Sequence, residues 1–387
     1  MERTAPDGAP TVGVIGGGQL ARMLAAPASA LGIGLRVLTR AADDPAAQVV
    51  ADTWLGDWAD AATVAEFARG CAVLTVEHEG QTRSDAATCP VHPSPQALRC
   101  AQDKLFMRRT LTEYGYPGPR WAQVTDVADV VACARNWGWP VILKAPRGGY
   151  DGRGVWRVAD RMSAERVLAD MSGGLLAETS GGLLAEECVP FERELAAAVA
   201  RSPSGQAVAY PVVATTQTDG ICTEVVAPAP RLSDDRALAA SHLALSIARD
   251  LAVTGMLTVE LFDTGTDLLI NELAMRPHNC GHWSIEGAIT SQFENHLRAV
   301  LDFPLGDPRL RAPCAVMVNV LGGTATGLTG AYRHVLARDP QVKVHLYGKA
   351  VRPGRKLGHV TLLGDRPEPL LVRARHAADY LSGRITE

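Results

Sequence analysis

The strongest constraint on the fold is a pair of apolar runs that each carry one glutamate. Residues 256–262 (MLTVELF) and 268–273 (LLINEL) are rich in β-forming residues and are joined by the turn-like segment DTGTD, a pattern that predicts a hairpin. Such a hairpin places Glu260 and Glu272 side by side. Their apolar neighbours favour burial, and a buried carboxylate pair needs a counter-charge. The alternative is that both glutamates are surface charges on an exposed hairpin.

The polar groups around this hairpin suit a hard metal ion. Glu260, Glu272 and the adjacent Asn271 offer oxygen ligands, and Mg²⁺ commonly uses few protein ligands and takes the rest from phosphates and water. Directly afterwards the sequence RPHNCGH supplies Arg276 and His278. We therefore predict a magnesium and phosphate site here, with Arg276 and His278 as candidates for the chemistry.

The first hundred residues alternate strand and helix signals. Short apolar runs occupy residues 11–15, 35–39 and 71–77, and residues 19–31 have a helical pattern. Strands that alternate with helices predict a parallel sheet with helices on both faces. Residues 95–114 then predict a helix that leads into the next unit.

A glycine turn separates the first predicted strand from the first helix. Gly16, Gly17 and Gly18 fit the GxGxxA pattern of a dinucleotide site, but the second strand ends LRVLTR without an acidic residue for a ribose. A nicotinamide cofactor is therefore disfavoured, although a helix N-terminus still attracts an anion. Glu77 and Glu79 follow the third strand, and open α/β sheets bind ligands at this end of their strands.

The middle of the chain predicts a small α/β lid at about 120–190. It contains a helix at 127–137, the strand PVILKA, the glycine-rich loop GGYDGRG at 148–154 and the strand LLAEECV. Glycines let backbone N–H groups approach phosphate oxygens closely, and Lys144 precedes this loop on its strand. For Lys104 an exposed helix position remains an alternative to phosphate binding. Further strands are expected at 194–200, 206–213 and 221–227, with helices at 234–251, through Asn295 and at 370–381. The tandem SGGLLAE copies within 172–186 have no evident function.

Composition excludes several other classes. The chain has 387 residues, enough for two or three domains, and a formal net charge of −4, so no general attraction for nucleic acid or an anionic membrane follows. The eight cysteines show no CxxC spacing, which argues against a zinc site or a disulfide framework and favours a reducing compartment. No signal peptide or 18-residue apolar run is present, and we expect a cytoplasmic protein.

Six segments together resemble the ATP-grasp carboxylase family of N5-carboxyaminoimidazole ribonucleotide synthases. They are VGVIGGGQLARML, GGYDGRG, EECVPFERE, INELAMRPHNCGHW, SQFENHLRAVL and YGKAVRPGRKLGHVT, in chain order. The resemblance implies an α/β and α+β architecture: an ATP-grasp fold, an N-terminal doubly wound pre-ATP-grasp domain and a small C-terminal β-rich domain. The implied boundaries are 1–103, 104–306 with its lid at about 120–190, and 307–387.

The resemblance also implies an activity and a set of site residues. The reaction would be ATP- and bicarbonate-dependent carboxylation of 5-aminoimidazole ribonucleotide through carboxyphosphate, in de novo purine biosynthesis, with two Mg²⁺ ions on Glu260 and Glu272. The implied catalytic residues are Arg276, His278, Asp151 and Arg153. The implied ATP contacts are Lys104, Lys144, Gly149, Tyr150, Asp151, Gly152, Arg153, Gly154, Glu186, Glu187, Cys188, Val189, Glu194, Gln217, Asn271 and Glu272. The implied nucleotide-substrate contacts are Gln19, Glu77, Glu79, Lys349, Arg355 and Lys356.

Some of these assignments have plainer alternatives. Glu194 on a strand edge fits a solvated residue as well as a ribose ligand, and Lys349, Arg355 and Lys356 fit a solvated basic face as well as a phosphate site. The other expected partners are small molecules only, with no nucleic acid and no membrane. The family is commonly dimeric, so we expect a homodimer.

The chain departs from the family pattern at four positions. Gln217, Met275, Cys280 and Val155 stand where the family commonly has His, Pro, Ser and Gln. These departures leave open an ATP-grasp paralogue that joins another carboxylate and amine through an acyl-phosphate, in secondary metabolism. A third hypothesis is a non-catalytic nucleotide-binding module, against which the Glu260/Glu272 pair and Lys144 argue.

Overall fold

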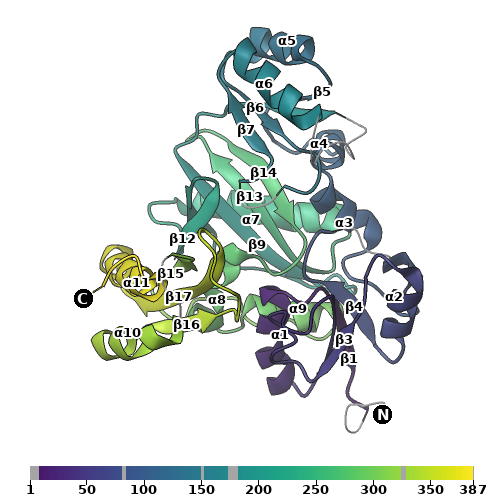
Figure 1. Cartoon of the computed structure of the whole chain (residues 1–387), viewed down its shortest axis with the longest axis vertical. Helices are drawn as coiled ribbons and strands as arrows, with labels where there is room; N and C mark the ends of the chain where they lie inside the picture. Colours follow the sequence, from purple (N-terminus) through teal and green to yellow (C-terminus); the bar gives the residue numbers. More distant parts are fainter. Residues whose placement is uncertain (1–7, 81–83, 150–151, 173–181, 324–327, 387) are drawn as a thin grey trace.

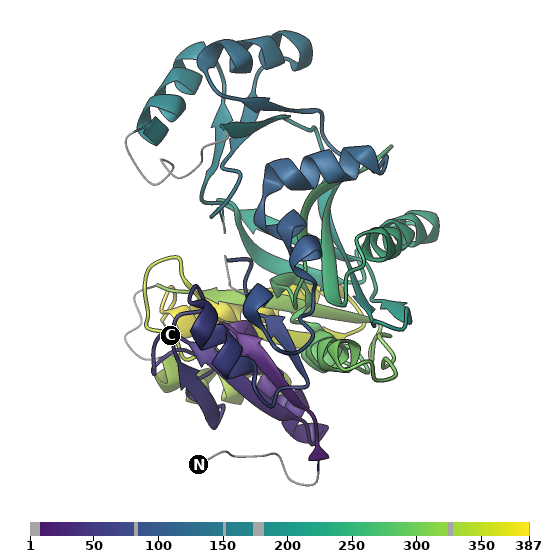
Figure 2. The ribbon, with the colours of Figure 1, turned by 90° about the vertical axis from the view of Figure 1, so that its right-hand side faces the viewer.

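The computed structural model describes residues 8–80, 84–149, 152–172, 182–323 and 328–386. A small α/β lid lies above a large central sheet, and the N-terminal domain and the C-terminal elements lie side by side below it (Figure 1). A view at right angles shows the lid as a separate unit above the rest of the molecule (Figure 2). No helix among the described residues is long and apolar enough to cross a membrane.

The N-terminal domain contains the expected parallel sheet, in strand order β3-β2-β1-β4. Its elements are β1 (Thr11–Ile15), α1 (Gln19–Ala30), β2 (Gly34–Thr39), β3 (Asp52–Leu55), α2 (Ala61–Ala68), β4 (Val73–Val76) and the short 3-10 turn η2 (Ser84–Ala86). Strands β1 and β4 are buried on both faces, as parallel strands between helices must be. The edge strand β3 was not predicted, because DTWL is largely half-buried and lacks an apolar run.

The continuous helix expected at 95–114 is wrong, since the chain forms two helices that meet at Asp103. They are α3 (Pro95–Gln102) and α4 (Lys104–Glu113). Asp103 has an extended backbone, and its carboxylate accepts the Phe106 N–H at 3.0 Å, which is a typical N-cap contact. The break makes Lys104 the first residue of α4.

The lid is a four-stranded antiparallel sheet, in order β5-β8-β6-β7, with two helices on it. Its elements are β5 (Trp121–Val124), α5 (Val127–Trp137), β6 (Val141–Lys144), β7 (Val155–Val158), α6 (Arg161–Ser172) and β8 (Leu183–Glu187). Helix α5 has the bounds that the sequence predicts. The second SGGLLAE copy leads into β8, whereas most of the first lies outside the described residues.

The central sheet is antiparallel, and among the described residues it continues without interruption into the C-terminal part of the chain. Its order is β14-β13-β9-β11-β12-β15-β17-β16, with β10 paired to β9. The strands are β9 (Arg193–Arg201), β10 (Ala207–Ala209), β11 (Val213–Thr218), β12 (Ile221–Ala227), β13 (Gly255–Asp263), β14 (Leu268–Ala274), β15 (Cys314–Leu321), β16 (Lys343–Leu346) and β17 (Lys356–Gly364). The single strand expected at 206–213 is wrong, because Tyr210 and Pro211 separate β10 from β11 and proline has no N–H for a ladder.

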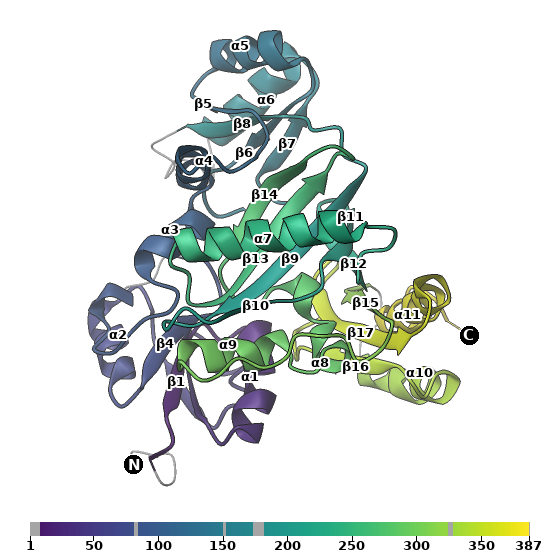
Figure 3. The same ribbon diagram turned by 180° about the vertical axis from the view of Figure 1, so that it is seen from behind.

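The remaining helices hold these parts together. They are α7 (Asp234–Asp250), the 3-10 turn η3 (Asn279–Gly281), α8 (Ser284–Gly287), α9 (Gln292–Val300), the 3-10 turn η4 (Leu328–Ala331), α10 (Tyr332–Arg338) and α11 (Pro367–Ser382). Helix α7 crosses the back of the central sheet, and α9 lies between that sheet and α1 (Figure 3). The apolar side chains Phe293, Leu297 and Val300 of α9 share a core with Val12 and Leu24 of the N-terminal domain.

Candidate active site

The hairpin predicted from sequence forms, and its two glutamates are direct cross-strand partners. Glu260 on β13 pairs with Glu272 on β14, and the register shifts at the next residue, so Leu261 pairs with Ile270 and Asn271 is the extra residue. Burial and the charge of Glu272 raise the pKa of Glu260 to about 7. Burial alone would also raise the pKa of Glu272, but an ion pair with Lys104 outweighs it and lowers that pKa.

This carboxylate pair is suited to a divalent cation. When both carboxylates are ionised, they carry two negative charges, and the ion pair at the hairpin is the one between Glu272 and Lys104. The nearby His278 does not supply a second positive charge. The His278 Nε2 lies 3.5 Å from Glu260 Oε1, but burial and the charges of Arg276 and Lys356 lower the pKa of His278 to about 3. No cluster of three or more metal-ligating side chains occurs in the described part of the chain, which agrees with an ion that takes its other ligands from phosphate and water.

A second group of charges, rich in cations, lies across from the hairpin. Glu186 on β8 is 2% exposed and contacts Arg108 at 2.5 Å and Lys144 at 2.8 Å. Lys144 also donates to Asn271 Oδ1 at 2.9 Å, so it joins the lid to the hairpin. Burial alone would raise the pKa of Glu186, but the two cations outweigh it and hold this pKa at about 2.

Arg108 is a site residue that the sequence analysis missed. Its guanidinium is 2% exposed and donates to the carbonyls of Ile270 and Asn271 at 2.6 and 2.9 Å. It therefore fixes the backbone of β14 beside the metal candidates. The available signal was its position four residues after Lys104, since helical residues at this spacing lie on the same face.

The hinge between the lid and the central sheet contains the residues expected near adenine and ribose. The Glu187 carboxylate accepts from the Arg120 N–H at 2.8 Å and from its Nε at 2.6 Å, Cys188 is exposed and Val189 is buried. Glu194 lies on β9 opposite Phe262, and burial raises the pKa of its carboxyl to about 7.

The described part of the glycine-rich loop rests on the turn between β11 and β12. A Cβ added at Gly152, where φ is +76°, would lie 3.0 Å from the Asp219 carbonyl oxygen. The close backbone approach therefore requires glycine. Gly149 and Gly154 flank the exposed Arg153, and Gln217 lies at a register shift on β11. Tyr150 and Asp151, also expected here, lie outside the described residues.

On the substrate side, the anion at the first glycine turn is a side chain of the protein itself. The Glu77 carboxylate accepts the N–H groups of Gly18, Leu20 and Ala21 at 3.0, 3.2 and 3.4 Å, so it caps α1, whose first residue is Gln19. A Cβ added at Gly18 would lie 2.1 Å from Glu77 Oε1. The third glycine is thus required by the capping carboxylate. Burial raises the pKa of Glu77.

Three parts of the chain meet at this end of the parallel sheet. Arg276, in the loop after β14, pairs with Glu79 through N···O distances of 2.7 and 2.8 Å. Lys349 lies close enough to Glu77 to favour its ionised form, and the Gln48 amide donates to the Gly348 carbonyl at 2.8 Å. The basic loop of the C-terminal part is therefore attached to the N-terminal domain.

The three predicted phosphate ligands differ in their surroundings. Lys349 Nζ lies 5.8 Å from the centroid of the Tyr347 ring. Lys356 opens β17 and acts electrostatically on Glu260 and His278, so it faces the metal candidates as well. Arg355 donates to the Ala350 carbonyl at 3.2 Å and closes its own loop.

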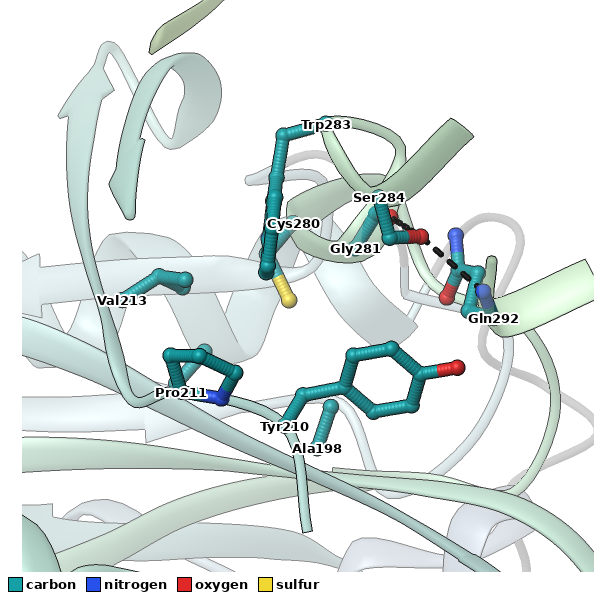
Figure 4. A pocket seen from close by; sticks show the side chains of 10 residues that line it. Ala198, Tyr210, Pro211, Val213, Cys280, Gly281, Trp283, Ser284 and Gln292 are labelled. Carbon is teal, nitrogen blue, oxygen red and sulfur yellow. Dashed lines mark hydrogen bonds between the residues drawn. The ribbon is translucent and has the colours of Figure 1, made fainter. Parts of the chain in front are cut away.

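A small cavity lies beneath the loop that follows His278. Tyr210, Cys280, Trp283 and Gln292 are among the side chains that line it (Figure 4). Its volume of about 10 Å³ has room for one water at most, so it is a packing gap and not the ligand site. A wider groove of about 610 Å³ lies between Arg108 and Trp137, along the end of α4 and the start of β5.

The sequence matches three known domain families that follow one another along the chain. They are the ribonucleotide synthetase preATP-grasp domain at residues 9–102, the ATP-grasp domain at 109–293 and the phosphoribosylaminoimidazole carboxylase C-terminal domain at 315–373. With the site geometry above, these matches define an ATP-grasp ligase.

Full-length relatives narrow this class. The N5-carboxyaminoimidazole ribonucleotide synthase of Mycobacterium tuberculosis is 50% identical over 98% of this chain and 90% of its own. The same enzyme of Aspergillus clavatus, in a crystal structure with ATP, superposes with a TM-score of 0.87 at 33% identity, over 98% of this chain and 99% of that one. A structure of the Aspergillus enzyme with ADP and 5-aminoimidazole ribonucleotide gives 0.87 at 32% identity, over 97% and 99%. The chain belongs to the N5-carboxyaminoimidazole ribonucleotide synthase family.

Proposed function

We propose that the chain catalyses ATP- and bicarbonate-dependent carboxylation of 5-aminoimidazole ribonucleotide, giving N5-carboxyaminoimidazole ribonucleotide for purine biosynthesis. The observation that carries this proposal is the loop from Arg276 to His278. Arg276 contacts the substrate-side Glu79, while His278 lies 3.5 Å from the metal candidate Glu260. One short segment therefore joins the two half-sites that a carboxylation through an activated phosphate requires.

Glu260 and Glu272 are proposed to hold two Mg²⁺ ions, with Asn271 beside them. When bound, the ions neutralise the charge that develops on the transferred phosphoryl group. The pKa of Glu260, raised to about 7 by burial and by the charge of Glu272, fits a carboxylate that lacks a full counter-charge. Lys104 already contacts Glu272 and is placed to shift toward a phosphate oxygen.

Lys144 and the glycine-rich loop are proposed to bind the ATP phosphates. Lys144 is buried but points to the hairpin through Asn271, and the loop glycines 149, 152 and 154 allow close approach of backbone amides. The Glu187 N–H already donates to the Arg120 carbonyl at 3.0 Å, so we assign the adenine contact to Cys188 and Val189. Glu194 is assigned to the ribose hydroxyls and Gln217 to the neighbourhood of the loop.

The reaction then needs one phosphoryl transfer and one carboxylation. A bicarbonate oxygen attacks the γ-phosphorus, the bond to the ADP oxygen breaks, and carboxyphosphate forms. Carboxyphosphate is hydrolysed quickly in water, so closure of the lid over the site is a chemical requirement. Arg276 has the planar donor geometry that binds a carboxylate or phosphate at two points, and Asp151 and Arg153 are proposed to act at the phosphates when the loop closes.

Carboxyphosphate then releases inorganic phosphate as its C–O bond breaks and carbon dioxide forms in the site, and His278 is proposed to accept the proton that leaves the exocyclic amine when this nitrogen attacks the carbon dioxide. A general base must be unprotonated before the reaction, and burial keeps His278 neutral at physiological pH by lowering its pKa. Lys349, Arg355 and Lys356, with Gln19, Glu77 and Glu79, are assigned to the nucleotide substrate. Lys349 and Lys356 are better placed than Arg355, which contacts its own loop.

Two of the four departures from the family pattern, Met275 and Cys280, do not favour a different amine. Met275 is fully buried and therefore contributes packing. The Cys280 thiol is 1% exposed and lies 3.1 Å from His278 Nδ1, behind the imidazole. We further propose a cytoplasmic homodimer, as the family resemblance suggests, which sedimentation of the purified protein tests.

The deciding assay measures ADP release with bicarbonate, in the presence and absence of 5-aminoimidazole ribonucleotide. We expect strong stimulation by the nucleotide and one carboxylated product for each ADP. Complementation of a purine auxotroph that lacks this activity is the matching test in cells. Absence of nucleotide-stimulated ADP release would sink the proposal and favour another ATP-grasp ligase.

A further inference from the structure

Gln292 makes hydrogen bonds to the backbone of His278, and the mechanism proposed above does not use them. Its side chain is 1% exposed. The Oε1 accepts the His278 N–H at 2.9 Å, and the Nε2 donates to the His278 carbonyl at 2.8 Å. The amide thus pairs with both backbone groups of a single residue, as a neighbouring β-strand would. The side chain of Gln292, on helix α9, therefore hydrogen-bonds both the N–H and the carbonyl of His278.

The pattern leaves no freedom in how the amide is oriented. If the amide were flipped, its Nε2 would face the His278 N–H and its Oε1 would face the His278 carbonyl. A donor would then face a donor and an acceptor would face an acceptor, so both hydrogen bonds would be lost. The second Nε2 hydrogen points to His282 Nδ1 at 3.0 Å. Because an amide nitrogen only donates, this Nδ1 must accept, and the neutral His282 ring carries its proton on Nε2.

The backbone of Gln292 is held against the same loop. The Ser284 hydroxyl accepts the Gln292 N–H at 2.9 Å and donates to the Gly281 carbonyl at 2.6 Å (Figure 4). Gly281 also leaves the space that the amide occupies, because a Cβ added there would lie 2.4 Å from Gln292 Oε1. The φ of Gly281 is not in the left-handed region, so space, not backbone strain, explains this glycine.

Helix α9 gives this side chain a rigid base. Further along the helix, His296 Nδ1 accepts the Met256 N–H at 3.2 Å, and its Nε2 lies 2.9 Å from the Thr75 hydroxyl. Thr75 is on β4, two residues before Glu77, and Met256 is on β13, which bears Glu260. One helix therefore contacts the substrate-side strand, the metal-side strand and the His278 loop.

We infer that Gln292 is a positioning residue for the carboxylation step, holding His278 at its place between Glu260 and the substrate side. The inference rests on the proposed function, because the residue that the Gln292 amide holds in place is His278, the proposed general base. A displacement of about 1 Å in a catalytic group can reduce a rate by about a hundredfold. Loss of the two His278 hydrogen bonds is therefore expected to lower kcat while ATP binding is retained.

The first test compares Gln292→Met, which has nearly the same length but no hydrogen bonds, with Gln96→Met on the exposed side of α3. We expect kcat for nucleotide-dependent ADP release to fall roughly 10- to 100-fold in Gln292→Met, with the KM for ATP within about twofold of wild type. The ratio of ADP to carboxylated product should rise above one. Gln96→Met should match the wild type in all three measurements.

The second test restores the hydrogen bonds through pH. A protonated carboxyl at position 292 can accept the His278 N–H and donate to the His278 carbonyl as the amide does, although it has no second hydrogen for His282 Nδ1, and burial raises the pKa of such a group. We expect Gln292→Glu to approach wild-type activity at low pH and to lose it, relative to wild type, as its carboxyl ionises. Gln292→Met should show no such relative pH dependence, since its side chain does not titrate.

The third test uses the space at Gly281 in a double-mutant cycle. Gly281→Ala should displace the amide and reduce kcat as Gln292→Met does. In Gln292→Ala the obstructing atoms are gone, so adding Gly281→Ala should cost much less than it does alone. If the losses in kcat from Gly281→Ala and Gln292→Ala were additive, the absence of a side chain at Gly281 would not be explained by the position of the Gln292 amide.

The outcomes separate this inference from the proposed function. A wild-type enzyme without nucleotide-stimulated ADP release overturns the function. If folded Gln292→Met has the kcat and product ratio of wild type, the inference is overturned and the proposed function stands. The same holds if the loss of activity equals the fraction of Gln292→Met that is unfolded. A crystal structure of Gln292→Met is the check that needs no activity: we expect the His278 backbone to move, and an unchanged His278 would refute the positioning role.

Discussion

The two carboxylate sites that Lys144 joins differ in their burial and their charge balance, since Glu186 is buried whereas the side chains of Glu260 and Glu272 are 26% and 42% exposed. On the lid strand β8, Glu186 lies between two cations, Lys144 and Arg108. On the hairpin, the described residues show an ion pair between Glu272 and Lys104, and the charge of Lys356 also acts on Glu260. Counted over Glu260 and the groups in these contact ion pairs, the lid side has one positive charge in excess and the hairpin has one negative charge in excess, which the charge of Lys356 partly offsets.

The pKa values follow this difference. The pKa of Glu186 is held at about 2, whereas that of Glu260 rises to about 7. A compensated buried carboxylate is part of the architecture, while a half-buried pair with one lysine partner has a place for a cation. The proposed magnesium–ATP ligand would offer a cation to the hairpin and phosphates to Lys144, so its two ends would match the negative excess of the hairpin and the positive excess of the lid side.

The largest expected effect comes from Glu272→Gln, which keeps the shape of the hairpin and removes one charge. A metal ion supplies several kcal/mol of transition-state stabilisation, so ADP formation should fall by about 10³-fold or more. The fold should survive, since a neutral amide at position 272 would relieve repulsion from Glu260. Rates are compared with those of Glu113→Gln, an exposed change on α4, and far-ultraviolet circular dichroism confirms folding. Wild-type turnover would show that the hairpin is not the metal site.

Glu186→Gln should have the opposite character and act first on stability. It leaves Arg108 and Lys144 buried without their carboxylate, and breaking a buried ion pair in this way costs about 3–5 kcal/mol. Urea denaturation measures this loss, with Glu187→Gln, whose partner Arg120 is largely exposed, as the matched control. Equal stability of the two variants would contradict the distinction between compensated and uncompensated carboxylates.

Lys349→Ala extends the comparison to the basic loop of the C-terminal part. A charge-assisted contact to the substrate phosphate is worth roughly 1.5–3 kcal/mol, so the apparent affinity for 5-aminoimidazole ribonucleotide should weaken about ten- to hundredfold. The apparent affinity for ATP should change little, because the charge of Lys349 acts on Glu77, on the proposed substrate side. Two saturation curves on the purified variant decide the matter. Equal weakening for both substrates would move Lys349 out of the substrate site.

The smallest effect concerns Glu194, which is uncompensated like the hairpin pair but carries a single carboxyl. Burial raises its pKa from 4.5 to about 7. A raised folded-state pKa means that the folded protein binds more protons, so this group's contribution to stability is present below pH 4.5 and is lost as pH rises through about 7. Each pKa unit corresponds to ~1.4 kcal/mol, and partial exposure reduces the full amount.

Glu194→Gln should therefore be more stable than wild type at about pH 8, by about 1–2 kcal/mol, and this advantage should vanish near about pH 4. Denaturation curves of both proteins at the two pH values measure the difference. A constant difference across this range would show that Glu194 titrates normally.

Local sequence patterns predicted the hairpin well because its signal lies within a short stretch of chain. Alternating β-formers, the DTGTD turn and the spacing of Glu260 and Glu272 suffice to define strands and register. Helices α5, α7 and α11 were predicted for the same reason. The failures occurred where a single residue breaks an otherwise helical or extended pattern, as Asp103 and Pro211 do.

Contacts between distant segments could not be predicted in this way. Nothing in the neighbourhood of Arg108 indicates that its guanidinium binds the carbonyls of β14, 162 and 163 positions away. Glu77 was expected on the substrate side, but the hydrogen bonds by which its carboxylate caps α1, 57 and 59 positions away, could not be predicted. Gln292 likewise reads as an ordinary first-turn residue of a helix until its two hydrogen bonds to His278 are seen.

The sequence by itself therefore determined which residue types supply the chemistry, because metal, phosphate and general-base ligands must have particular atoms at short, local spacings. Tertiary structure decided the charge balance. Whether a carboxylate is compensated, as Glu186 is, or left with a negative excess, as Glu260 and Glu272 are, depends on which cations are packed beside it after burial. Desolvation and nearby charge, which together set these pKa values, arise only when β8, β14 and α4 come together.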